Sequence, residues 1–189
     1  MKKIISSTIV LVIITLVAGL ALSAVYELTK EPIAAAEEAA KQNAYRMVMS
    51  EADAFVPQSI PSEGSAVDEC LIAQKADATV GYVVTATSPN GYGGNITVVV
   101  GVRPDGSINA LSVLSQSETA GLGAVCAEDK FTSQFKGLSG VIEYTKGDHT
   151  ADNQIDAISG ATITTSAVTE AVNAALAYVN TTYLAGEGN

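Results

Sequence analysis

The first part of the chain is dominated by one apolar run, Ile4–Val25, whose only polar members are serines and threonines. About 22 helical residues extend roughly 33 Å, which matches a hydrocarbon core of roughly 30 Å. The run therefore predicts a transmembrane helix. A cleaved signal peptide is the alternative, but secretory apolar cores are usually about 7–15 residues long, which favours a retained anchor. Under either interpretation the basic residues Lys2 and Lys3 stay in the cytoplasm and the rest of the chain is exported.

A second helical pattern follows the anchor. Pro32 begins a segment rich in alanine and glutamate, which predicts a helix from about Pro32 to Glu51. Its apolar positions fall near one face, suited to packing on the domain or on a neighbouring membrane subunit: Ile33, Ala36, Ala40, Ala44, Met47 and Val48. Prolines, serines and a glycine between Pro57 and Ser65 then mark the start of a compact domain.

Beyond this connection, alternating apolar and polar positions predict consecutive antiparallel strands. We expect them at Val67–Gln74, Thr79–Thr87, Ile96–Val102 and Ser107–Ser115, with a shorter strand at Val141–Thr145. A hairpin turn is predicted at Arg103–Gly106, because Pro104 presets the turn and Gly106 releases it.

Two helices are predicted beside this sheet. Asp129–Lys136 is short and places Phe131 and Phe135 in the core. After a polar, turn-like segment at Gly147–Asn153, the last helix extends to Tyr183 and covers the inner face of the sheet with one apolar stripe, made of Val168, Val172, Ala175, Leu176, Val179 and Tyr183. The predicted fold class is α+β: a cytoplasmic tip (1–3), one N-terminal transmembrane helix (4–25), a linker helix and connection (26–60), and one domain (61–189) with a mainly antiparallel sheet covered by helices.

Charge and cysteine content narrow the function classes. The exported part holds all 20 acidic residues and eight of the ten basic ones, a net charge of −12, which argues against nucleic acid as a partner. His149 is the only histidine, and Cys70 and Cys126 form no paired motif, so ligands for an iron–sulfur cluster or a metal centre are lacking. The two cysteines form either a disulfide or two buried thiols. Redox chemistry would require a borrowed cofactor.

The stretch best suited to binding or chemistry is Asp156–Thr165, which begins the last helix. The first helical N–H groups lack intrahelical partners, and Gly160 and Ala161 let a ligand approach the backbone, so the stretch suits a phosphate. The simpler alternative is that Ser159 or Thr162 is only an N-cap. A helix N-terminus contributes roughly 0.3–1 kcal/mol to the free energy of binding an anion, whereas micromolar affinity requires a binding free energy of about 8 kcal/mol. A retained cofactor therefore needs many more contacts or a covalent bond. Thr162 offers a hydroxyl for such a bond.

Two short motifs then resemble those of flavin-attachment domains. The sequence from Asp156 to Thr162 resembles D-x-x-S/T-G-A-T, in which FMN is joined through its phosphate to the final threonine, here Thr162. The sequence from Glu118 to Gly123 resembles E-T-x-G-L-G, a loop that lies against the flavin. Two matches in this order, behind a single anchor, resemble the G subunit of the Rnf electron-transport complex and, more distantly, the C subunit of the sodium-pumping NADH:quinone reductase.

This resemblance implies an electron-transfer subunit in a membrane complex that couples ferredoxin and NAD redox chemistry to ion translocation. It implies other Rnf-type membrane subunits as partners, and a flavin transferase that cleaves FAD and esterifies FMN onto Thr162. The protein would be a single-pass component of the inner or plasma membrane, with its N-terminus cytoplasmic and its domain outside. As one part of a translocase it would contain no complete catalytic site, and no Ser-His-Asp or paired-carboxylate arrangement is indicated.

The resemblance also assigns the residues around the flavin. Those near the phosphate, besides Thr162, would be Ser159, Gly160, Ala161, Ile163 and Thr164; those near the ring would be Glu118, Thr119, Leu122 and Gly123. Tyr92 is a candidate for stacking on the ring, or else an ordinary loop aromatic. Asp156 either serves the transferase during attachment or caps the turn. Two other functions stay open: a free-standing membrane-tethered FMN protein that relays electrons or senses redox state, and an anchored binding domain whose Thr162 is never modified.

Overall fold

Helix α1 (Lys2–Val48) begins the computed structural model, which describes residues 2–60 and 66–185. The chain divides into two compact units, Met1–Lys41 and Gln42–Asn189. Within the first unit the described residues all belong to α1, whose large apolar side chains between Ile4 and Val25 are exposed. By length and composition α1 is able to cross a membrane. This confirms the long apolar helix predicted at the N-terminus.

The linker region differs from its prediction because α1 is continuous through Pro32. Proline removes one helical hydrogen bond and usually costs about 3 kcal/mol inside a helix. The residues on both sides of Pro32 are strong helix formers, and their summed propensity favours continuation. The anchor and the linker helix are therefore one element, which ends at Val48 rather than Glu51. At that end, the Asn109 side-chain amide donates to the Val48 carbonyl oxygen at 2.7 Å.

Only the last turns of α1 belong to the domain. Ala44, Tyr45, Val48 and Met49 are buried, whereas Met47, predicted on the apolar face, is 69% exposed. The buried group packs on one face of the sheet, against Leu71, Ala73, Val83 and Val99. The apolar face that packs thus differs from the predicted one and includes Tyr45, whose hydroxyl donates to Glu69 Oε2 at 2.8 Å.

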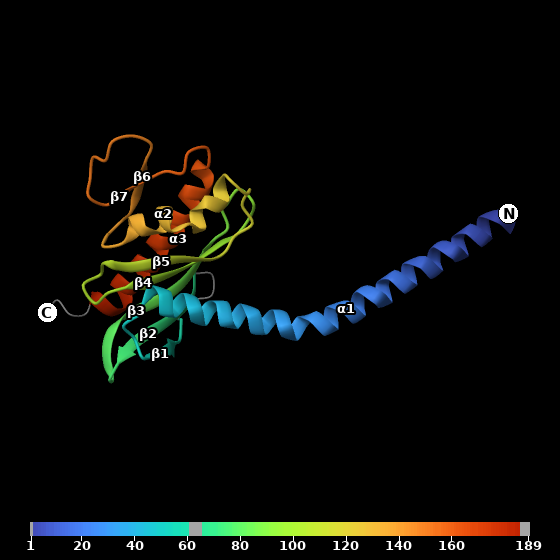
Figure 1. Cartoon of the computed structure of the whole chain (residues 1–189), viewed down its shortest axis with the longest axis horizontal. Helices are drawn as coiled ribbons and strands as arrows, with labels where there is room; N and C mark the ends of the chain where they lie inside the picture. Colours follow the sequence, from blue (N-terminus) through green and yellow to red (C-terminus); the bar gives the residue numbers. More distant parts are fainter. Residues whose placement is uncertain (1, 61–65, 186–189) are drawn as a thin grey trace. The chain divides into compact units, whose positions relative to one another are not determined.

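Five antiparallel strands form the main sheet in the order β1-β2-β3-β4-β5 (Figure 1). They are β1 (Ala54–Gln58), β2 (Val67–Lys75), β3 (Ala78–Ser88), β4 (Ile96–Val102) and β5 (Ile108–Ser115). This confirms the four long strands and the hairpin at Arg103–Gly106, where Gly106 has φ +82°. Strand β1 was not predicted, since its residues fall in the expected connection; as an edge strand it tolerates Pro57. Residues 61–65 of that connection lie outside the described residues.

Helix α3 (Thr162–Val179) covers the other face of the sheet and continues into a π-helical turn, η3 (Asn180–Leu184) (Figure 1). Its predicted apolar stripe is buried from Val168 to Val179, while the last member, Tyr183, lies in η3 and is half-buried against the same core. Phe131 and Phe135 are also buried, with ring centroids 5.5 Å apart. Cys70 and Cys126 are buried in the same core as free thiols, so of the two alternatives the disulfide is wrong.

Short elements connect the sheet to α3. They are η1 (Gly123–Ala127), α2 (Asp129–Thr132), η2 (Ser133–Phe135), β6 (Glu143–Thr145) and β7 (Gln154–Asp156). Strands β6 and β7 are parallel and form a separate two-stranded sheet. The sequence predicted neither β7 nor the 3-10 turn η1, because runs of three to five residues carry too little periodicity.

Candidate functional site

The turn from Ile158 to Ala161 sets the position where α3 begins. The Ala161 N–H donates to the Ile158 carbonyl at 3.0 Å, and Gly160 has φ +77°, a conformation that favours glycine. The buried Thr165 hydroxyl holds both ends of this turn, since it accepts from the Ile158 N–H and donates to the Ala161 carbonyl, each at 3.0 Å. Thr162 is thereby fixed as the first helical residue.

This helix start has no side-chain cap. Its N-cap residue is Ala161, and the first intrahelical bond runs from the Thr165 N–H to the Ala161 carbonyl at 3.0 Å. The alternative in which Ser159 or Thr162 is an N-cap is therefore wrong. The N–H groups of residues 162–164 precede that first bond, and their partial positive charge favours an anion. Within the part of the chain that the structure describes, the Thr162 hydroxyl makes no hydrogen bond.

Glu118 joins three walls of a cavity at this helix start. Its Oε1 accepts from the Gly93 N–H at 2.8 Å, and its Oε2 accepts from the Thr164 hydroxyl at 2.5 Å. Both side chains of the second pair are buried, with Glu118 9% and Thr164 1% exposed. A Cβ at Gly123 would lie 2.5 Å from Glu118 Oε2 and from Thr164 Oγ1, so only glycine fits there. The 118–123 loop and the start of α3, far apart in sequence, thus form one structure.

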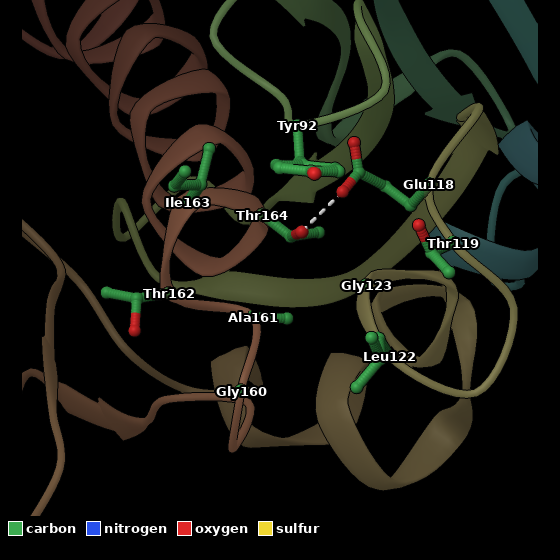
Figure 2. Close-up of a pocket in the computed structure, with 10 residues that line it drawn as sticks. All are labelled: Tyr92, Glu118, Thr119, Leu122, Gly123, Gly160, Ala161, Thr162, Ile163 and Thr164. Carbon is green, nitrogen blue, oxygen red and sulfur yellow. Dashed lines mark hydrogen bonds between the residues drawn. The ribbon is translucent and has the colours of Figure 1, made fainter.

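The cavity between these walls measures about 590 Å³, within the roughly 300–1,000 Å³ range of small-molecule sites. Figure 2 shows Tyr92, Glu118 and Thr164 at one end and Leu122 and Gly160 at the other. Its lining comprises Tyr92, Glu118, Thr119, Leu122, Gly123, Gly160, Ala161, Thr162, Ile163 and Thr164. These are the residues assigned from sequence, apart from Ser159. Three apolar members leave much of their surface exposed: Tyr92 73%, Leu122 49% and Ile163 53%.

The loop that carries Tyr92 is held at both ends by carboxylates. Glu118 holds Gly93, and Glu170, two turns beyond Thr162 on α3, accepts from the Ser88 hydroxyl and the Asn90 amide, each at 2.8 Å. These hydrogen bonds, first that from Asn90 and then that from Ser88, lower the pKa of Glu170. No sequence signal pointed to Glu170, because its partners lie about 80 residues away on other elements.

Ser159 and Asp156 do not line the 590 Å³ cavity. Ser159 lines a second cavity of about 370 Å³ together with Lys146, Ala157, Ile158, Gly160 and Thr162. Asp156 ends β7, and its Oδ1 lies 3.1 Å from His149 Nε2 at the surface. Lys146 was not singled out from the sequence, because a lysine in a polar loop matches no motif. Among the residues that the structure describes, no group of three or more His, Cys, Asp or Glu side chains could hold a metal ion.

Comparison with protein families identifies two segments of the chain. Residues 91–177 match the FMN-binding domain, and residues 1–48 match the RnfG N-terminal region. The first segment contains every residue of the 590 Å³ cavity. The cavity fits FMN in its chemistry: exposed apolar side chains suit a flat aromatic ring, while the uncapped helix start and the unpaired Thr162 hydroxyl suit a phosphate.

Whole-chain relatives agree with the segment matches. The G subunit of the proton-translocating ferredoxin:NAD(+) oxidoreductase complex of Clostridium ljungdahlii is 37% identical over 172 residues, covering 90% of this chain and 89% of the relative. The G subunit of the ion-translocating oxidoreductase complex of Methanosarcina acetivorans is 32% identical over 95% of this chain and 96% of its own length. The crystal structure of the C subunit of Na(+)-translocating NADH-quinone reductase from Parabacteroides distasonis shares the fold, with a TM-score of 0.51 and 24% identity over 59% of this chain and 60% of that one. The chain therefore belongs to the RnfG family, the G subunits of Rnf-type ion-translocating oxidoreductase complexes.

Proposed function

We propose that this chain is the flavin-carrying electron-transfer subunit of an Rnf-type complex, with FMN attached covalently through its phosphate to Thr162 Oγ1. A flavin transferase would supply the FMN from FAD. The Thr162 oxygen forms a bond to the phosphorus of the FMN half, the P–O bond of the pyrophosphate to the AMP half breaks, and AMP leaves as the hydroxyl proton is lost. When bound, FMN supplies the electron-accepting and electron-donating chemistry that the side chains lack.

The observation that carries this proposal is the position of Thr162. Its hydroxyl has no hydrogen-bond partner among the described residues, and it lines the same cavity as the loop from Glu118 to Gly123. A helix N-terminus contributes roughly 0.3–1 kcal/mol, far below the roughly 8 kcal/mol of micromolar binding, so a covalent bond gives the domain a means of keeping its cofactor outside the cytoplasm.

The remaining residues hold and orient the cofactor. Ala161, Ile163 and Thr164 surround the attachment point, and Gly160 leaves the backbone accessible. Tyr92 and Leu122 provide apolar surface on which a ring would pack, and Glu118 fixes the walls that carry them. Electron transfer requires only this positioning and the local electrostatics, without an acid, base or nucleophile from the chain.

The assembly and orientation belong to the same proposal. Lys2 and Lys3 would remain in the cytoplasm, α1 would cross the membrane, and the domain would lie outside. The relative from Clostridium ljungdahlii bears the name of a complex that couples ferredoxin and NAD redox chemistry to proton translocation. Since the present chain also matches the RnfG N-terminal region over residues 1–48, we favour a protein that works with other membrane subunits over a free-standing flavoprotein.

The test is to produce the full chain together with a flavin transferase, denature it, and measure both the flavin fluorescence of the protein band and its intact mass. We expect the wild type to gain one FMN less one water. Thr162→Ala should gain none, and Ser166→Ala, which removes an exposed hydroxyl of α3 that lines neither cavity, should gain the same mass as the wild type. Flavin retained by Thr162→Ala would show that the attachment site is wrong.

A further inference from the structure

The second cavity adjoins the proposed attachment point. It measures about 370 Å³ and shares Gly160 and Thr162 with the larger cavity. Its other lining residues include Ser159 from the turn and Lys146 from the loop that connects β6 to β7. Figure 2 shows Thr162 at the side of the larger cavity remote from Thr119 and Leu122. A group bonded to Thr162 Oγ1 therefore has access to two spaces.

These two spaces have opposite chemistry. The larger one carries the apolar surfaces of Tyr92, Leu122 and Ile163, and the carboxylate among its described lining residues is Glu118. The smaller one has one basic residue, Lys146, and two hydroxyl-bearing residues, Ser159 and Thr162, among its lining residues, with no carboxylate among those described. Lys146 makes no ion pair or hydrogen bond with any residue that the structure describes, so its ammonium group is available to an anion.

A flavin mononucleotide joined to a threonine has the same division. Its ring is flat and largely apolar, whereas its phosphodiester carries one negative charge and oxygen acceptors. Placing that charge in the larger cavity would bring it toward the Glu118 carboxylate, which disfavours it, while Lys146 and the Ser159 hydroxyl of the smaller cavity favour it. Apolar contacts with Tyr92, Leu122 and Ile163 favour the ring in the larger cavity.

We propose that the smaller cavity is the phosphate subsite, in which Lys146 binds the phosphodiester oxygens, and that the ring fills the larger cavity with Thr162 at the junction. This assignment rests on the proposed attachment to Thr162. It gives the domain a cation at the one point where its ligand is anionic, although the exported part as a whole has a net charge of −12.

The test compares the reactivity of two lysines in the full chain, produced with and without the flavin transferase. Lys130 is the matched control: it is exposed like Lys146 and lines a neighbouring cavity with Asp156 and Ser159, but that cavity does not include Thr162. Both samples are treated with limiting acetylating reagent in detergent, and the acetylation rate of each lysine is measured by peptide mass spectrometry. We expect attachment to slow acetylation of Lys146 several-fold and to leave Lys130 unchanged.

Two outcomes overturn the assignment of Lys146: equal acetylation of Lys146 in loaded and unloaded protein, or equal protection of Lys130. A chain that gains no FMN mass contradicts the proposed function instead, which intact mass detects separately. The variants give an independent readout by phosphorus NMR of the loaded protein. Lys146→Gln should shift the phosphodiester resonance and Lys130→Gln should not, whereas identical spectra for both variants would refute the contact. Loading of Lys130→Gln but not of Lys146→Gln would support it.

Discussion

The bond between the Thr164 hydroxyl and Glu118 Oε2 gives a sharp test of how the site is held together. The perturbation is Thr164→Val, which keeps the branched shape and removes only the hydroxyl. Thr164 is 1% exposed and Glu118 9% exposed, and the two oxygens lie 2.5 Å apart. A hydrogen bond to a charged group contributes roughly 1.5–3 kcal/mol, so we expect the free energy of unfolding to fall by about that amount.

Thr169→Val is the matched control on the same helix. Thr169 is 5% exposed, and its hydroxyl donates at 2.8 Å to the carbonyl of Thr165, one turn earlier. This bond joins neutral groups in a helix interior, so its loss should cost no more than about 1 kcal/mol. In a Glu118→Gln background, where the acceptor is uncharged, the cost of Thr164→Val should fall to roughly 0.5–1.5 kcal/mol.

The assay is urea unfolding of the full chain in detergent, followed by tyrosine circular dichroism because the chain has no tryptophan. Equal costs for Thr164→Val and Thr169→Val would refute the reasoning. So would a cost of Thr164→Val that is unchanged in the Glu118→Gln background. Either result would mean that the charge on Glu118 does not strengthen the contact between the loop and α3.

Two further predictions concern ionisable groups. Hydrogen bonds from Asn90 and Ser88 lower the pKa of Glu170. They therefore contribute stability that is present above the ordinary glutamate pKa of about 4.3 and is lost as pH falls through the lower pKa of the folded state. Glu170→Gln should remove part of the loss of stability that urea unfolding detects on acidification. Burial, and secondarily the Glu118 charge, raises the pKa of Cys126 to about 11, and burial also raises the pKa of Cys70. Because the thiolate is the reactive form, intact mass should detect no alkylation of either thiol near pH 8 in the folded protein. In urea it should detect alkylation of both.

The parts of the fold that the sequence predicts well are those with long periodic patterns. Strand β4 has the predicted bounds, and the stripe of α3 is buried as expected. The differences arise where one residue type suggests a break that tertiary structure overrides: Pro32 lies inside α1, and Pro57 lies in an edge strand. The parallel pair of β6 and β7 has only three residues in each strand, so its partners are set by packing rather than by pattern.

In the candidate site, too, some features could be predicted from sequence patterns and others could not. Residues of both motifs line one cavity together with Tyr92, because a motif records which residue types are required at a site; Asp156 and Ser159 are among the motif members that lie outside it. Motifs do not record how side chains contact each other. Glu118 lines the cavity, and its place beside a flavin ring stays a prediction; the structure adds that both of its oxygens accept hydrogen bonds from the protein. Glu170 and Lys146 match no sequence motif, and only the folded structure shows that they lie near the site.

The long-range contacts also explain why the site requires two motifs instead of one. The contacts at the start of α3, which are the turn at Gly160 and the two hydrogen bonds of the Thr165 hydroxyl, are local in sequence. The cavity is not local, because the bond between Glu118 and Thr164 joins residues 46 positions apart and requires the 118–123 loop to lie beside α3. A short segment around Thr162 would therefore present the hydroxyl without the apolar wall at Leu122. It follows that the folded domain, rather than the motif alone, supplies the space that a flavin ring requires.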